Sequence, residues 1–165
     1  DNTKHHIQTF CALKHFDFNE VNSFSYEQLY QTMRELNLNY ADAEQMYRRM
    51  VFNVLSRNCD DHTKNFSFRL KQGSKWELSP AYDVCHAYQP QHQWVSQHAL
   101  SINGKRKDFT KVDLLLIGKS ISCKNAAFII EEIQGVVNQW NNYAKEQEVL
   151  PKLRKEIAKT LLVLG

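Results

Sequence analysis

The most regular feature of the sequence is a run of apolar residues between positions 42 and 57. These residues recur at intervals of three or four, so they share one face of an α-helix. The pattern predicts a buried helix over residues 42–57, which delivers the chain into a polar cluster at 58–62. The apolar positions are Ala43, Met46, Tyr47, Met50, Val51, Val54 and Leu55.

The composition fits one globular domain spanning residues 1–165. Hydrophobic residues make up 42% of the chain and aromatic residues 12%, which is enough apolar surface for one core. The 21 basic and 18 acidic side chains leave a charge of +3, too small to indicate a nucleic-acid-binding protein. The longest aliphatic runs fall far short of the roughly 20 apolar residues that a membrane span needs. The four cysteines form no CxxC pair, which favours reduced thiols in a cytoplasmic protein.

Local signals predict a mainly α domain with one small β-hairpin. Residues 66–70 alternate between apolar and polar, a turn follows at 71–74, and 76–78 can return as a second strand. Ser25 and Thr110 each have a capping-box partner three positions later, so both are expected to begin helices. Further helices are expected over 4–15, from 122 or 125 to about 144, and from 151 to 164.

The polar loop after the predicted buried helix holds the chemistry. Asp60 and Asn65 stand in a D-x-x-x-x-N relation. This is the pattern of a kinase catalytic loop, in which the Asp accepts or orients the proton of the attacking hydroxyl and the Asn holds magnesium. Asp83 follows the predicted hairpin and could bridge the metal to the phosphates, because magnesium prefers hard oxygen ligands. The pattern therefore indicates ATP and Mg²⁺ as cofactors.

Two stretches carry a family resemblance. Residues 58–68 and 78–83 resemble the signature of the HipA family of bacterial serine/threonine kinases, the toxins of HipBA toxin–antitoxin modules. Residues 26–36, 42–55 and 100–106 are similar to the family's carboxy-terminal helical region. The resemblance implies a helical fold like a kinase C-lobe, with Asp60 as the catalytic aspartate and Asn65 and Asp83 as magnesium ligands.

The resemblance also implies partners. The substrate would be a protein hydroxyl, which in characterised members is often on an aminoacyl-tRNA synthetase. The antitoxin would be a DNA-binding HipB-like protein, so direct contact of this chain with nucleic acid would be at most auxiliary.

The same resemblance implies a missing part. A family member is more than twice as long, and its amino-terminal part carries a glycine-containing phosphate loop and a lysine that grips the nucleotide. The five glycines of this chain, at positions 73, 104, 118, 135 and 165, are isolated and cannot form a phosphate cradle. We therefore expect the chain to be the C-lobe alone, with weak nucleotide binding and no turnover by itself.

Each of the other polar residues of the region has a functional and a structural interpretation. His62 could contact a phosphate, with a hydrogen-bonded structural histidine as the alternative. Lys64 could neutralise the transferring phosphoryl group, or be an ordinary surface lysine. Asp61 could support the site or be a solvated loop residue. The basic residues at 105–107 could dock a substrate, an antitoxin or a DNA phosphate, although such a trio is more often a solvated turn.

Two other functional classes compete with the kinase. One is a non-catalytic domain, in which a degenerate C-lobe binds the antitoxin or another partner. The other is a metal-dependent hydrolase using Asp60, His62 and Asp83, which is disfavoured because His is a poor magnesium ligand. A zinc site is disfavoured by its spacing. The residues considered for zinc are Cys59, His62, Cys85 and His86.

Overall fold

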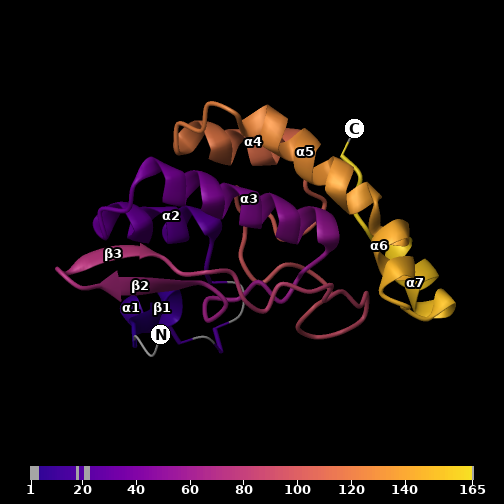
Figure 1. Cartoon of the computed structure of the whole chain (residues 1–165), viewed down its shortest axis with the longest axis horizontal. Helices are drawn as coiled ribbons and strands as arrows, with labels where there is room; N and C mark the ends of the chain where they lie inside the picture. The colour runs from indigo at the N-terminus through magenta and orange to yellow at the C-terminus, as the bar shows by residue number, and fades with distance from the viewer. Residues whose placement is uncertain (1–3, 18, 21–22, 165) are drawn as a thin grey trace.

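The structure is a computed structural model that describes residues 4–17, 19–20 and 23–164. A small sheet lies on one side of helices α2 and α3, helices α4 and α5 cover the other side, and α6 and α7 extend from one end (Figure 1). The elements are β1 (His6–Thr9), α1 (Phe10–Leu13), α2 (Tyr26–Glu35), α3 (Tyr40–Ser56), β2 (Ser67–Lys71), β3 (Lys75–Leu78), α4 (Lys111–Ser120), α5 (Ala126–Asn138), α6 (Trp140–Glu146) and α7 (Pro151–Ala158).

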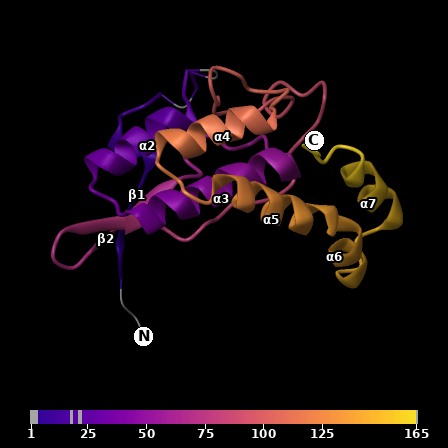
Figure 2. The ribbon, with the colours of Figure 1, turned by 90° about the horizontal axis from the view of Figure 1, so that it is seen from above.

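Helix α3 is the centre of the core, as its apolar pattern predicted. Met46, Met50 and Val54 are fully buried along it. The helix packs against α5, α2 and β3, and Figure 2 shows it beside α5 from above. The buried hydroxyl of Tyr47 donates a hydrogen bond of 3.0 Å to the carbonyl of Leu114, which connects α3 to α4.

The two predicted capping boxes are confirmed. The Ser25 side chain accepts a hydrogen bond from the Gln28 amide, and the Gln28 side chain bonds back to the Ser25 amide. Thr110 and Asp113 make the same reciprocal pair at the start of α4. Both boxes satisfy backbone amides that a helix leaves without partners in its first turn.

The sheet differs from the expectation of a lone hairpin. Strands β2 and β3 form the predicted hairpin, but residues 6–9 add a third antiparallel strand, so the order is β1-β2-β3. The prediction of a helix over 4–15 was wrong, because only Phe10–Leu13 is helical. Four residues carry too little periodicity to show a strand, and pairing with the edge of β2 outweighs their local preference.

The carboxy-terminal helices also differ from the prediction. The single helix expected up to residue 144 is divided at Gln139 into α5 and α6. Helix α7 begins at Pro151 as expected, but it ends at Ala158 and buries none of its residues. The chain then returns to the core, where the Leu162 amide donates to the Leu55 carbonyl at 3.0 Å. Within the described part of the chain, no helix combines the length and the apolarity needed to cross a membrane.

Candidate functional site

The candidate site begins where α3 ends. Arg57 adopts a left-handed backbone conformation (φ 59°, ψ 42°) that terminates the helix and turns the chain into the loop at 58–65. Within this loop the Asn65 side-chain amide donates to the Asp60 carbonyl at 2.8 Å, and the Asn65 backbone amide donates to the His62 carbonyl at 2.9 Å. The loop therefore folds back on itself and brings Asn65 beside Asp60.

The segment after β3 lies against this loop. The Asn58 side chain donates a 3.4 Å hydrogen bond to the carbonyl of Asp83, and the Tyr82 hydroxyl donates at 2.5 Å to the carbonyl of Lys64. Asp83 itself has a left-handed backbone (φ 53°), an uncommon conformation for a non-glycine residue. Two contacts thus hold the Asp83 segment next to the loop that carries Asp60 and Asn65.

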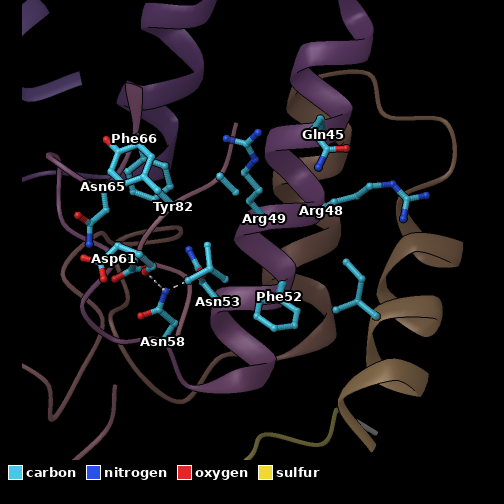
Figure 3. A pocket seen from close by; sticks show the side chains of 14 residues that line it. Gln45, Arg48, Arg49, Phe52, Asn53, Asn58, Asp61, Asn65, Phe66 and Tyr82 are labelled. Atoms are coloured by element: carbon cyan, nitrogen blue, oxygen red, sulfur yellow. Dashed lines mark hydrogen bonds between the residues drawn. The ribbon is translucent and has the colours of Figure 1, made fainter. Parts of the chain in front are cut away.

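A pocket of about 240 Å³ opens at this junction. Asn65 and Asp83 line it from the two loops, and Arg49, Phe52 and Arg48 line it from α3. Figure 3 shows the loop side chains on one side of the pocket and the helix side chains on the other. Asn65 and Asp83, both predicted to be magnesium ligands, therefore share one pocket.

The electrostatics of Asp60 reflect its neighbours. Partial burial raises the pKa of the Asp60 carboxyl, and the charges of Asp83 and Asp61 raise it further, whereas His62 and His92 lower it. His62 Nε2 lies 3.9 Å from Asp60 Oδ1. Carboxylates that repel one another in this way form a place where a bound cation would relieve the repulsion.

The chemistry of the donor atoms fits magnesium. The Nδ2 donor of Asn65 is used within the loop, so Oδ1 is the atom of that side chain suited to a cation. The Asp83 carboxylate supplies a second hard oxygen. Two oxygen ligands suit magnesium, which keeps several waters and completes its shell with substrate phosphates.

A site built from three protein ligands is not found among the residues that the structure describes. They contain no group of three or more His, Cys, Asp and Glu side chains that could hold a metal ion. Asp60, His62 and Asp83, the set considered for a hydrolase, therefore do not form such a group. Of the zinc candidates, Cys59 is buried and His86 pairs with the Thr160 hydroxyl at 2.8 Å.

The two predicted nucleotide contacts lie in the loop but outside the lining of the pocket. His62 is partly exposed, and its Nδ1 accepts a 3.3 Å hydrogen bond from the Lys64 amide. Lys64 is exposed, and its carbonyl receives the Tyr82 hydroxyl. The His62 ring and the Lys64 backbone thus make hydrogen bonds that stabilise the loop. Contact of either side chain with a nucleotide stays a prediction.

Asp61 was left open by the sequence and is the most enclosed carboxylate of the site. It is fully buried and accepts hydrogen bonds from Tyr26 Oη (2.7 Å), His98 Nδ1 (2.9 Å) and the amide of Ala99 (2.8 Å). The Leu100 amide adds a longer contact of 3.4 Å. Tyr26 and His98 are more than 30 positions away, so no local pattern could have identified them as partners.

The basic cluster at 105–107 is mostly engaged inside the fold. Lys105 pairs with Asp113 at 2.9 Å. The Arg106 guanidinium donates to the carbonyls of Phe24 and Ala99. Two of the three cations therefore stabilise loops of this chain.

The fold and the paired loops define a helical domain with an acidic site beside a small sheet. The family model for the HipA-like C-terminal domain matches residues 1–140. The chain therefore belongs to the family of HipA-like C-terminal domains.

Among solved structures, the chain is similar to HipA of Shewanella oneidensis MR-1, determined in a complex of HipA, HipB and operator DNA. The TM-score is 0.60 at 18% identity, and the match covers 98% of this chain and 39% of that one. The chain thus spans well under half of the HipA chain that it matches. No curated protein matches it.

Proposed function

We propose that the chain is the C-terminal catalytic region of a HipA-like serine/threonine protein kinase, the toxin of a toxin–antitoxin module. The reaction would be ATP- and Mg²⁺-dependent transfer of a phosphoryl group to a protein hydroxyl. The main support is the junction at which Asn65 bonds to Asp60 while Asn58 and Tyr82 hold the Asp83 segment against the same loop. Family membership supports the same conclusion.

In this proposal each residue has a separate task. Asp60 orients the attacking hydroxyl and accepts its proton as the phosphoryl group is transferred. Asn65 Oδ1 and the Asp83 carboxylate hold magnesium. The metal, when bound, supplies positive charge that neutralises the phosphates. The hydrogen bond between Asn65 and the Asp60 carbonyl fixes the separation between the proton acceptor and the metal ligand.

Two neighbouring residues complete the proposed loop. We assign Lys64 a contact with the transferring phosphoryl group and His62 a contact with the nucleotide. His62 also lies close enough to Asp60 to lower its pKa, so it favours the ionised form that accepts a proton.

The grip on the nucleotide would come from outside these 165 residues, from another part of the protein or from a separate polypeptide. The isolated glycines support this, because they supply no phosphate-binding loop. The proposed partner is a HipB-like antitoxin, in line with the HipA–HipB–DNA complex of the similar structure. The proposed substrate is a protein such as an aminoacyl-tRNA synthetase.

The test is kinase activity of the full-length protein carrying Asp60→Ala or Asp83→Asn. Asparagine is chosen at position 83 because it tolerates the left-handed backbone while removing the charge. We expect phosphorylation to fall by about 100-fold or more in each variant, with the fold intact by circular dichroism. Asp108→Asn, in an exposed turn that lines a different pocket, is the matched control.

Titration with ATP and magnesium separates the kinase from a domain that only binds partners. Binding that weakens in Asp83→Asn supports the enzyme. Near-normal phosphorylation in the Asp60 and Asp83 variants, or binding indifferent to Asp83, would refute the assignment and favour a non-catalytic partner-binding domain.

A further inference from the structure

A chain of buried hydrogen bonds connects the two loops of the candidate site from behind. Tyr26 donates its hydroxyl hydrogen to Asp61 at 2.7 Å and accepts a 3.1 Å hydrogen bond from Asn53. Asn58 then donates to Asn53 Oδ1 at 3.0 Å and to the Asp83 carbonyl at 3.4 Å. This hydrogen-bond chain therefore runs from Asp61, the residue next to Asp60, to the backbone of Asp83.

The residues of this hydrogen-bond chain are buried away from water. Tyr26 and Asp61 are fully buried, and Asn53 and Asn58 are 4% and 2% exposed. Burial raises the pKa of Tyr26 well above its usual value, and the charge of Asp61 raises it further, so its hydroxyl remains a donor at all physiological pH values. Direct competition from water for these bonds is therefore limited.

Asp61 is held at the other end by a buried ion pair. His98 is 1% exposed and bonds to Asp61 Oδ2, while the Ala99 amide bonds to Oδ1. Both carboxylate oxygens thus have hydrogen-bond partners, which restrain the position and orientation of Asp61. Because Asp60 is the next residue, its backbone is restrained by the same contacts.

We propose that Asp61 and Tyr26 are positioning residues, which set the separation between Asp60 and Asp83 through the buried hydrogen-bond chain. The inference rests on the proposed kinase function and deepens it. Stability alone does not explain why these residues are polar, because apolar residues of the same volume often stabilise a fold as well as a buried ion pair does. Geometry gives a stronger reason, since a misplacement of about 1 Å can cost about 100-fold in rate.

The test compares two tyrosines in the full-length protein. Tyr26→Phe removes the hydroxyl that joins Asp61 to Asn53. Tyr47→Phe is the matched control, because the Tyr47 hydroxyl also makes a buried hydrogen bond, to the Leu114 carbonyl on the far side of α3 from these loops. We expect Tyr26→Phe to lower kcat at least tenfold with KM for ATP within about threefold, and Tyr47→Phe to change neither.

A second pair of variants tests Asp61 in the same way. Asp61→Asn should lower kcat at least tenfold as well, because it keeps the shape of the side chain but removes the charge that pairs with His98. Asp113→Asn is its control, since Asp113 is also buried and ion-paired, but lies at the start of α4.

Amide hydrogen exchange supplies a readout that does not depend on activity. In Tyr26→Phe the amides of 58–65 and 82–85 should exchange faster than in the wild type, while those of α5 should not change. A uniform increase over the whole chain, or exchange unchanged in both loops, would overturn the proposal. The proposal would also be overturned if Tyr26→Phe had the same kcat as Tyr47→Phe while Asp60→Ala was inactive. Full activity of Asp60→Ala would instead refute the kinase assignment, and the catalytic part of this inference with it.

Discussion

The buried pair of His98 and Asp61 predicts a pH-dependent stability. Burial opposes protonation of His98, but the Asp61 charge, the hydrogen bond to Asp61 and the neighbouring Cys59 outweigh it and raise its pKa to about 9. Two further side chains lie near the His98 ring in the described part of the protein. Phe109 contacts it edge to face, and the Arg106 guanidinium donates to backbone carbonyls. A pKa of about 9 would keep the His98 ring protonated in the folded protein at neutral pH.

The size of the effect follows from the two pKa values. An unfolded chain protonates histidine with a pKa of roughly 6.5, and each tenfold difference in proton affinity is worth about 1.4 kcal/mol. A folded pKa of about 9 therefore links about 3 kcal/mol of stability to this proton. Because the folded value is the higher one, the contribution is complete below about pH 6.5 and is lost as the pH rises through 9.

The assay is urea unfolding of the wild type and of His98→Gln at several pH values between 6 and 10. Glutamine keeps a side-chain donor for Asp61 but does not titrate, so the difference between the two curves isolates His98. We expect the advantage of the wild type to shrink by about 3 kcal/mol over this range. The reasoning would be refuted if the free energies of unfolding of the two proteins changed in parallel with pH, or if the His98 ring titrated near 6.5 by NMR.

Two further predictions concern packing and capping. Gly118→Ala should destabilise the fold by about 1–3 kcal/mol, because the new Cβ would lie 2.5 Å from the Ala126 Cβ. Gly135→Ala, with open space at its Cβ, is the control, and thermal unfolding that ranks the two equally would contradict the packing argument. Ser25→Ala should cost about 1 kcal/mol in chemical denaturation, since it removes the cap of α2. An unchanged midpoint would mean that the cap adds nothing.

The parts of the fold that sequence reasoning predicted well are those encoded locally. Helix α3 shows its apolar face within its own 17 residues, and the caps at Ser25 and Thr110 each need only a partner three positions away. Strand β1 was missed because its evidence lies in β2, about 60 residues later. The break at Gln139 was missed because the apolar spacing continues across it.

The candidate site, like the fold, has a part that the sequence predicts locally and a part that only the tertiary structure shows. The spacing of Asp60 and Asn65 and the hairpin before Asp83 led us to expect one shared location, and the structure brings the two loops together. Their catalytic and metal-binding roles stay predictions. The partners of Asp61 could not be predicted, because Tyr26 and His98 reach it from opposite directions along the chain and only tertiary packing joins them.

After α7 the chain returns to α3, beyond the point where the match to the family model ends. The family pattern ends at residue 140, yet Leu162 bonds to Leu55 and Leu164 bonds to Gln134 of α5. The last residues thus fasten the final turn of α3, just before the chain enters the loop of Asp60. A protein trimmed at the edge of the recognisable pattern would lose these hydrogen bonds, and with them a restraint on the turn that leads into the loop of Asp60.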